Sequence, residues 1–325
     1  MTAGESATGA GGVGRAPDPA RPSDSAMPSD PARPPDSARP LQVAGRNMGR
    51  RHATDRAMRA LLALAAVLAV IPLLLVVVFV VVQGLPAFNV ALLTQSPVPA
   101  GFPGGGVAPA VVGTLIMVGL GTLLGTPIAV LAGIYIREYA GGRGATVIRF
   151  LVDVLAGVPT IAIGLFAYGL VVVPMGSFSA LAGGVALAVI IIPIVARVTD
   201  EMLGLVPGSV REAAYALGIP PWKTIVRVVL PAAATGIVTG ILLGVARIAG
   251  ETAPLIFTAL GNDRVSTSLG EPMDALPLRI WVYATGPYDS WHQQAWAASL
   301  VLVLMVLIFS ILTRLVLRRR LAARA

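Results

Sequence analysis

Residues 211–260, REAAYALGIPPWKTIVRVVLPAAATGIVTGILLGVARIAGETAPLIFTAL, join a short polar segment to a long apolar one. The polar part predicts a helix, a break and a second helix. The apolar part predicts a membrane helix that contains Arg247 and Glu251. A charged side chain at the centre of a bilayer costs roughly 2.5–3.5 kcal/mol on insertion scales. Such residues are rare in membrane helices, and they mark an ion or substrate path by default.

Arg247 and Glu251 are four residues apart, so a helix presents them on one face. Gly236, Gly240 and Gly244 form a ladder of small residues on an overlapping face. Glycines at this spacing let a neighbouring helix approach closely. The pattern predicts a polar site at a helix–helix seam. The alternative is an internal Arg–Glu pair that satisfies only itself.

The composition is that of an integral membrane protein. Apolar residues make up 56% of the 325 residues, and the mean hydropathy is +0.81, whereas a soluble domain has roughly 45–50% apolar residues. The chain has no cysteine and two histidines. These counts exclude disulfides, thiolate metal sites and a multi-histidine metal site within the chain.

Six apolar stretches are long enough to cross a bilayer. We place them at about 60–82, 108–136, 150–173, 180–197, 231–260 and 295–317. Most of the 24 lysine and arginine residues fall in segments that this topology puts in the cytoplasm, as the positive-inside rule requires. The predicted fold class is therefore an all-α membrane protein with about six transmembrane helices and both termini cytoplasmic.

Residues 1–45 are rich in Pro, Ala, Ser, Gly and Asp and contain almost no large apolar side chain. Such a segment cannot bury enough surface to offset its chain entropy, so we expect a disordered cytoplasmic tail. No short apolar run with a small-residue cleavage site opens the chain, and we expect no cleaved signal peptide. Residues 46–325 form the predicted transmembrane domain.

The basic excess, a net charge of +8, lies in the loops that flank the membrane. We therefore expect lipid, and no nucleic acid, as the partner of these charges. The chain's single lysine, Lys223, follows Trp222, so a Walker A loop is absent. His-Glu-x-x-His is also absent. We expect no catalytic residue, no metal site and no cofactor.

Arg197 ends the fourth predicted span and precedes Asp200 and Glu201. A long arginine side chain at a helix end can reach the interface, so the residues alone leave open whether Arg197 snorkels or faces a pore. Arg149 and Asp153 are four residues apart near the interface. We favour a local surface pair there over a gating role.

The polar segment, about 199–231, carries a specific pattern: E-A-A, three residues, G, nine residues, an apolar residue, any residue, L-P. It resembles the EAA loop of ATP-binding-cassette (ABC) importer permeases, with Val228 where isoleucine is usual. The resemblance implies the type I importer permease fold, and a coupling helix that enters a groove on a separate ATPase. The matching residues are Glu212, Ala213, Ala214, Gly218, Leu230 and Pro231.

Residues 216–259, together with DVLAGVPTIAIGLFAYGL (153–170) and ALAVIIIPIVARVTDEML (186–203), resemble the PstA-type permeases of the phosphate-specific importer. The resemblance implies a multi-pass subunit of the bacterial plasma (inner) membrane. It also implies a PstC-type sister permease, two PstB-type ATPase subunits and an extracytoplasmic PstS-type phosphate-binding protein. In that family, charged residues matching Arg197, Arg247 and Glu251 are linked to phosphate passage.

Three alternatives stay open. The chain could serve another oxyanion, such as sulfate or molybdate, or be the sister permease. It could be a channel or secondary transporter that needs no ATPase. It could also be a membrane scaffold or sensor that transports nothing.

Overall fold

The computed structural model describes residues 48–99, 102, 104–139 and 141–322. The predicted tail, 1–45, lies outside the described residues. The chain divides into two compact units, 1–65 and 66–325. The described part of the first unit is the beginning of helix α1, where Arg59 Nη2 donates to Asp55 Oδ2 over 2.7 Å.

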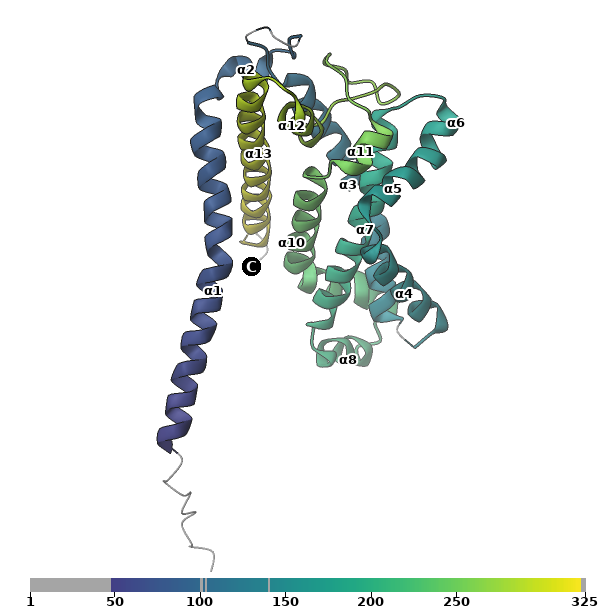
Figure 1. Ribbon diagram of the computed structural model, residues 1–325. Helices are drawn as coiled ribbons and strands as arrows, with labels where there is room; N and C mark the ends of the chain where they lie inside the picture. The colour runs from purple at the N-terminus through teal and green to yellow at the C-terminus, as the bar shows by residue number, and fades with distance from the viewer. Residues whose placement is uncertain (1–47, 100–101, 103, 140, 323–325) are drawn as a thin grey trace, which may run out of the picture. The chain divides into compact units, whose positions relative to one another are not determined.

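The described residues form helices, turns and one isolated β-bridge, between Leu260 and Met273. In chain order the α-helices are α1 (Met48–Gly84), α2 (Val90–Thr94), α3 (Ala108–Glu138), α4 (Arg143–Gly157), α5 (Thr160–Ala167), α6 (Val173–Met175), α7 (Ala180–Gly204), α8 (Gly208–Ala216), α9 (Pro221–Thr224), α10 (Leu230–Ala249), α11 (Ala253–Thr258), α12 (Leu276–Thr285) and α13 (Asp289–Ala322). A 3₁₀ turn, η2 (Leu85–Ala87), and two π-helical segments, η3 (Tyr168–Val172) and η4 (Ile225–Val229), complete the order (Figure 1).

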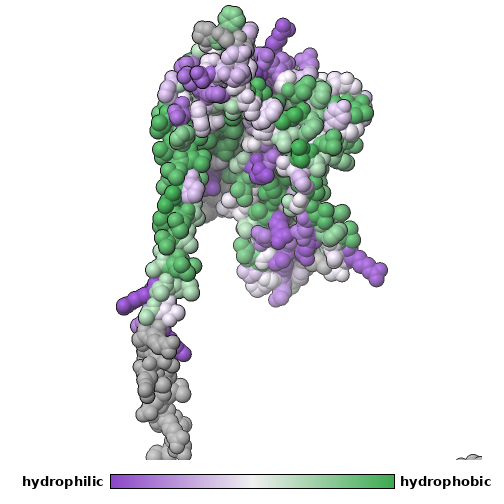
Figure 2. Space-filling model, in the orientation of Figure 1, coloured by the Kyte–Doolittle hydropathy of each residue, from purple (hydrophilic) through white to green (hydrophobic). Residues whose placement is uncertain are grey.

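Five helical segments in the described part are long and apolar enough to cross a membrane. They are Arg51–Ala87, Ala108–Glu138, Ala180–Gly204, Pro221–Ala249 and Asp289–Leu315. A sixth crossing is present if α4 and the α5–α6 segment are counted as one broken span. Figure 2 shows hydrophobic residues along the flanks of the helices, with hydrophilic residues gathered near the helix ends.

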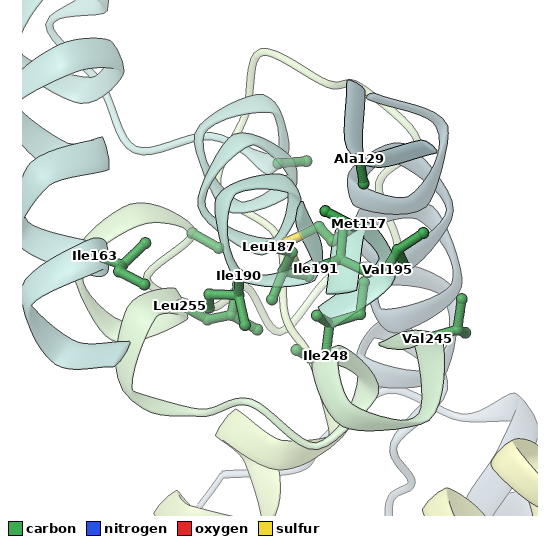
Figure 3. Packing of buried hydrophobic residues seen from close by; sticks show 14 of the residues in the cluster. Met117, Ala129, Ile163, Leu187, Ile190, Ile191, Val195, Val245, Ile248 and Leu255 are labelled. Atoms are coloured by element: carbon green, nitrogen blue, oxygen red, sulfur yellow. The ribbon is translucent and has the colours of Figure 1, made fainter. Parts of the chain in front are cut away.

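The core of the second unit lies where α3, α7 and α10 meet (Figure 3). Its members are aliphatic, as expected for helices that pack along apolar stripes. Met117 of α3, Leu187 and Ile191 of α7, Ile248 of α10 and Leu255 of α11 are each at most 2% exposed. Helix α3 approaches α7 closely at its glycines, because a Cβ at Gly121 would lie 2.8 Å from Leu187 Cβ.

The α10 glycine ladder also packs as predicted, against α7. A Cβ on Gly244 would lie 2.8 Å from Ile191 Cγ1. Positions 240 and 236 face Val198 and Met202 in the same way. The two helices therefore run antiparallel at backbone contact distance, which only small residues allow.

Three predicted spans differ from the structure. The third, 150–173, is not one helix: α4 begins at Arg143, and the chain bends by 105° between Gly157 and Thr160. Pro159 in this break disfavours continuation of the α4 helix. The fourth does not end at 197, because α7 continues to Gly204. The fifth, 231–260, is helical from Pro221 and stops at Ala249.

Candidate functional site

Arg247 and Glu251 form the predicted ion pair, with Arg247 Nη1 2.7 Å from Glu251 Oε1. The two sides of the pair differ in burial: the Arg247 side chain is 58% exposed and that of Glu251 is 6% exposed. Glu251 lies just past the end of α10, in the break before α11, so Arg247 is in the last turn of its helix and not near the middle. Despite the short distance, Glu251 Oε1 accepts no well-aligned hydrogen bond among the described residues. The pair thus holds an accessible cation over a buried carboxylate.

Arg197 is an accessible cation too, with a 61% exposed side chain. Its Nη1 donates to Asp153 Oδ1 of α4 over 2.6 Å, and its Nε donates to Glu201 Oε1 over 3.4 Å. The structure thus pairs Asp153 with Arg197, and not with Arg149 as the local spacing suggested. Arg149 instead lies 3.5 Å from Asp200.

The two arginines occupy different levels of the α7–α10 pair. Gly240 of α10 faces Val198 of α7, which puts Arg197 at about the level of Gly240. Arg247 is seven residues further along α10, so it lies about 10 Å away along the axis at 1.5 Å per residue. The structure brings Arg247 and Glu251 together and keeps Arg197 at a separate position.

The segment with the EAA pattern folds as the sequence predicts, into helix α8, a break and α9. Gly218 makes the break with φ +74°, a left-handed conformation that disfavours a side chain. Glu212, Ala213 and Gly218 are exposed, while Ala214 is buried. Leu230 is half-buried and Pro231 is exposed in the first turn of α10. The exposed face also carries Leu217, which is 80% exposed.

Arg211, at the start of this segment, makes contacts that its sequence neighbours do not reveal. Its Nη2 and Nε donate to the two carboxylate oxygens of Glu138, at the end of α3, over 2.7 and 3.2 Å. Its Nη1 donates to the Val206 carbonyl over 2.8 Å, and its Nη2 also donates to the Leu203 carbonyl over 3.0 Å. The hydrogen bonds that Arg211 donates to the Glu138 carboxylate raise the pKa of Arg211, so the guanidinium stays charged. The two residues are 73 positions apart, so no local spacing in the sequence predicts this pair.

A second ion cluster, of buried Arg279 and Asp274 with exposed Asp263, lies at α12, outside the membrane-spanning segments. Arg279 donates from Nε to Asp274 and from Nη2 to Asp263, both over 2.6 Å. Burial raises the pKa of Asp274 to about 6, although the Arg279 guanidinium opposes the shift. The cluster lines a cavity of about 440 Å³ with Tyr283 and Trp291. No spacing in the sequence groups these residues.

Within the described ranges, no group of three or more His, Cys, Asp or Glu side chains is arranged to hold a metal ion. The site consists of arginines that are each neutralised by acidic side chains of the same chain. Such an arrangement can bind an anion by exchange, because an incoming oxyanion can take over the guanidinium donors from a carboxylate.

Comparison with solved structures shows a shared fold. The chain is similar to a subunit of the MetNI methionine ABC transporter in inward-facing conformations, with a TM-score of 0.53 and 21% sequence identity. The match covers 66% of this chain and 93% of that one. At this identity the likeness concerns the fold alone.

Comparison with known sequences shows much nearer relatives. The "Phosphate transport system permease protein PstA" of Haemophilus influenzae is 49% identical over 236 residues, which is 72% of this chain and 83% of that protein. The protein of the same name in Yersinia pestis is 46% identical, over 74% and 82% of the two chains. A "Probable phosphate transport system permease protein PstA" of Methanocaldococcus jannaschii is 42% identical, over 71% and 82%.

Residues 125–321 match the family described as "Binding-protein-dependent transport system inner membrane component". The match includes α7, the α8 segment, Arg247 and Glu251. This chain therefore belongs to the family of binding-protein-dependent transport system inner membrane components, among its PstA members.

Proposed function

We propose that this chain is a permease subunit of an ATP-driven importer, and that it passes inorganic phosphate inward across the plasma membrane. The observation that carries the proposal is the 49% identity to a phosphate permease over 83% of that protein's length. The chemistry of the site supports the same substrate. Arginine offers a planar fork of donors that matches phosphate oxygens and stays charged at any physiological pH.

The substrate path in this proposal runs past Arg247 with Glu251 and then Arg197. Each guanidinium is neutralised by a carboxylate when no anion is present, so the path is not a permanent anion trap. Phosphate would displace Glu251 from Arg247 first, and Asp153 from Arg197 next. The two levels are about 10 Å apart, so the α7–α10 pair offers two successive anion-binding stations.

The energy comes from a partner in this proposal. The chain itself is non-catalytic, and ATP is hydrolysed on two PstB-type subunits. The exposed face of α8, with Glu212, Ala213 and Gly218, is the contact for these ATPases, and Ala214, Leu230 and Pro231 shape the segment behind it. A PstC-type sister permease completes the pore, and a PstS-type binding protein delivers phosphate from outside.

Uptake by reconstituted proteoliposomes tests the proposal. The chain is co-expressed with a PstC-type sister permease and a PstB-type ATPase, and radiolabelled phosphate and sulfate are offered with the binding protein. We expect phosphate uptake that requires hydrolysable ATP. Sulfate uptake instead of phosphate would make this a permease for another oxyanion. Phosphate uptake without any ATPase would make it a channel or secondary transporter.

A further inference from the structure

Arg211 joins three helices at the end of the second unit where α8 lies (Figure 1). It lies in α8, its carboxylate partner ends α3, and its two carbonyl partners lie at and just beyond the last turn of α7. The side chains of Arg211 and Glu138 are 18% and 7% exposed. A bidentate Arg–carboxylate pair with this little exposure is both strong and geometrically restrictive.

The carbonyls of Leu203 and Val206 belong to a helix end, where the last C=O groups lack partners within the helix. Arg211 supplies donors to both, and its positive charge suits the C-terminus of α7. The Leu205–Pro207 connection between α7 and α8 is therefore braced by a side chain that reaches back across it. Because these bonds involve the joint itself, α8 cannot swing about that connection without breaking them.

The other end of α8 is built differently. Gly218 follows it in a left-handed conformation, and Pro220 caps the short α9 helix. The π-helical segment η4 then leads into α10. Glycine breaks and π-helical segments are places where backbone geometry adjusts readily and where function is often found. On this side α8 is held by apolar packing, with Val210 against a buried cluster that includes Val229 and Ala233, and no ion pair like Arg211–Glu138 is present among the described residues.

We infer that Arg211 is a positioning residue that makes α8 move as one body with the ends of α7 and α3, so that a displacement of α8 is passed on to these helices. The inference rests on the proposed function and deepens it. Arg197 lies on α7, so a displacement of α8 by an ATPase would move this proposed station. Glu138 is the second positioning residue, because its carboxylate accepts hydrogen bonds from the Arg211 guanidinium.

The first experiment measures coupling in the reconstituted complex, as phosphate moved per ATP hydrolysed. In Arg211→Gln and Glu138→Gln we expect the ATPase to copurify and hydrolyse ATP, while the coupling ratio falls at least about five-fold, the lower end of ordinary coupling energies. Arg211→Lys keeps the positive charge but not the bidentate geometry, so its coupling ratio should lie between those of wild type and Arg211→Gln. Arg143→Lys is the matched control, because Arg143 is exposed and makes no hydrogen bond or ion pair with any described residue.

The charge-swapped double variant, Arg211→Glu with Glu138→Arg, should recover part of the coupling that each single change loses. A purely structural role predicts a different result: uptake and ATP hydrolysis fall together with the yield of complex, at an unchanged ratio. That result overturns the inference. If Arg211→Gln does not assemble, Arg211→Lys carries the same comparison.

A second experiment needs no phosphate, so it separates this inference from the proposed function. The chain has no native cysteine, so spin labels can be placed at Ser209 in α8, at Ser177 just before α7 and at Thr239 in α10, all exposed. We expect the 209–177 distance to be narrow and independent of nucleotide, and the 209–239 distance to be narrow as well, because α10 packs closely against α7. Arg211→Gln should broaden the 209–177 distribution. An unchanged distribution in that variant overturns the inference, even if phosphate transport is confirmed.

Discussion

The Arg197 guanidinium of α7 donates to the Asp153 carboxylate of α4 over 2.6 Å, although the two residues are 44 positions apart. Both side chains are substantially exposed, at 61% and 46%. Asp153 lies in the last turns of α4, just before the 105° bend. An anion that binds Arg197 therefore competes with the residue that ties α4 to α7.

Replacing Asp153 by Asn should tighten phosphate binding at Arg197 and slow its release. Exposed ion pairs are worth about 0.2–1 kcal/mol, so we expect the KM for uptake to fall by up to about five-fold. The maximal rate should fall as well, because phosphate then has less competition for the guanidinium. Initial uptake rates over a range of phosphate concentrations measure both. Asp55→Asn, the same change in an exposed pair on α1, should leave both constants alone, and a raised KM in Asp153→Asn would refute competition.

Arg247→Gln should reduce phosphate uptake by at least about ten-fold, since a charged hydrogen bond is worth about 1.5–3 kcal/mol. It should also lower thermal stability, because Glu251 would remain buried without its cation. The double change with Glu251→Gln should restore the melting temperature without restoring uptake. Uptake and thermal unfolding in detergent distinguish these effects. A double variant that transports normally would show that the pair only satisfies itself.

Glu212→Ala should weaken the association with the ATPase and leave the isolated chain as stable as before, because the side chain is exposed. Leu217→Asp should act in the same direction, since Leu217 is 80% exposed on the same segment. Exposed changes of this kind usually alter stability by less than about 0.5 kcal/mol. Copurification and melting temperature are the two measurements. Full ATPase binding by both variants would place the contact elsewhere.

Gly240→Ala should destabilise the α7–α10 seam, because the added methyl group would overlap Val198 Cγ1. Overpacking of this kind costs about 1–3 kcal/mol. Gly119→Ala is the control: a Cβ there meets nothing within 4 Å, so α3 should be unchanged or slightly more stable. Melting temperatures of the two variants in the same detergent give the answer. Equal melting temperatures for the two variants would contradict close packing of α10 against α7 at Gly240.

Asp274 gives a pH dependence whose sign follows from its raised pKa. Burial raises the pKa from 3.8 to about 6, so the folded state binds a proton that the unfolded state has released between these values. The free energy of unfolding therefore gains a contribution as the pH falls from 7 to 4, of up to about 3 kcal/mol at 1.36 kcal/mol per unit.

Asp274→Asn should remove that contribution. Protonation of other paired carboxylates destabilises wild type and variant alike in acid. The quantity to follow is therefore the difference in melting temperature between the two proteins across pH 4–7. The melting temperature of wild type should rise relative to that of the variant as the pH falls. Asp289→Asn, at an exposed position, should give a difference that does not change with pH. A flat difference for Asp274→Asn would mean that the carboxyl titrates normally.

The sequence was most informative where the determinants are local. Apolar runs predicted the membrane helices, since length and hydropathy decide whether a segment can cross a bilayer. Gly218 and the paired prolines predicted the break after α8. The four-residue spacing predicted the Arg247–Glu251 contact, because that spacing alone places two side chains on one helix face. The glycines of α10 likewise predicted a close neighbour, without naming α7.

The sequence by itself therefore determined an all-helical membrane chain and its membership among importer permeases. Tertiary structure alone decided which distant charges meet. It extended α7 to Gly204, and it paired Arg149 with Asp200, Arg197 with Asp153 and Arg211 with Glu138. Helix periodicity relates only residues three or four positions apart. Contacts between residues 44 or 73 positions apart arise from how whole helices cross, which no local spacing encodes.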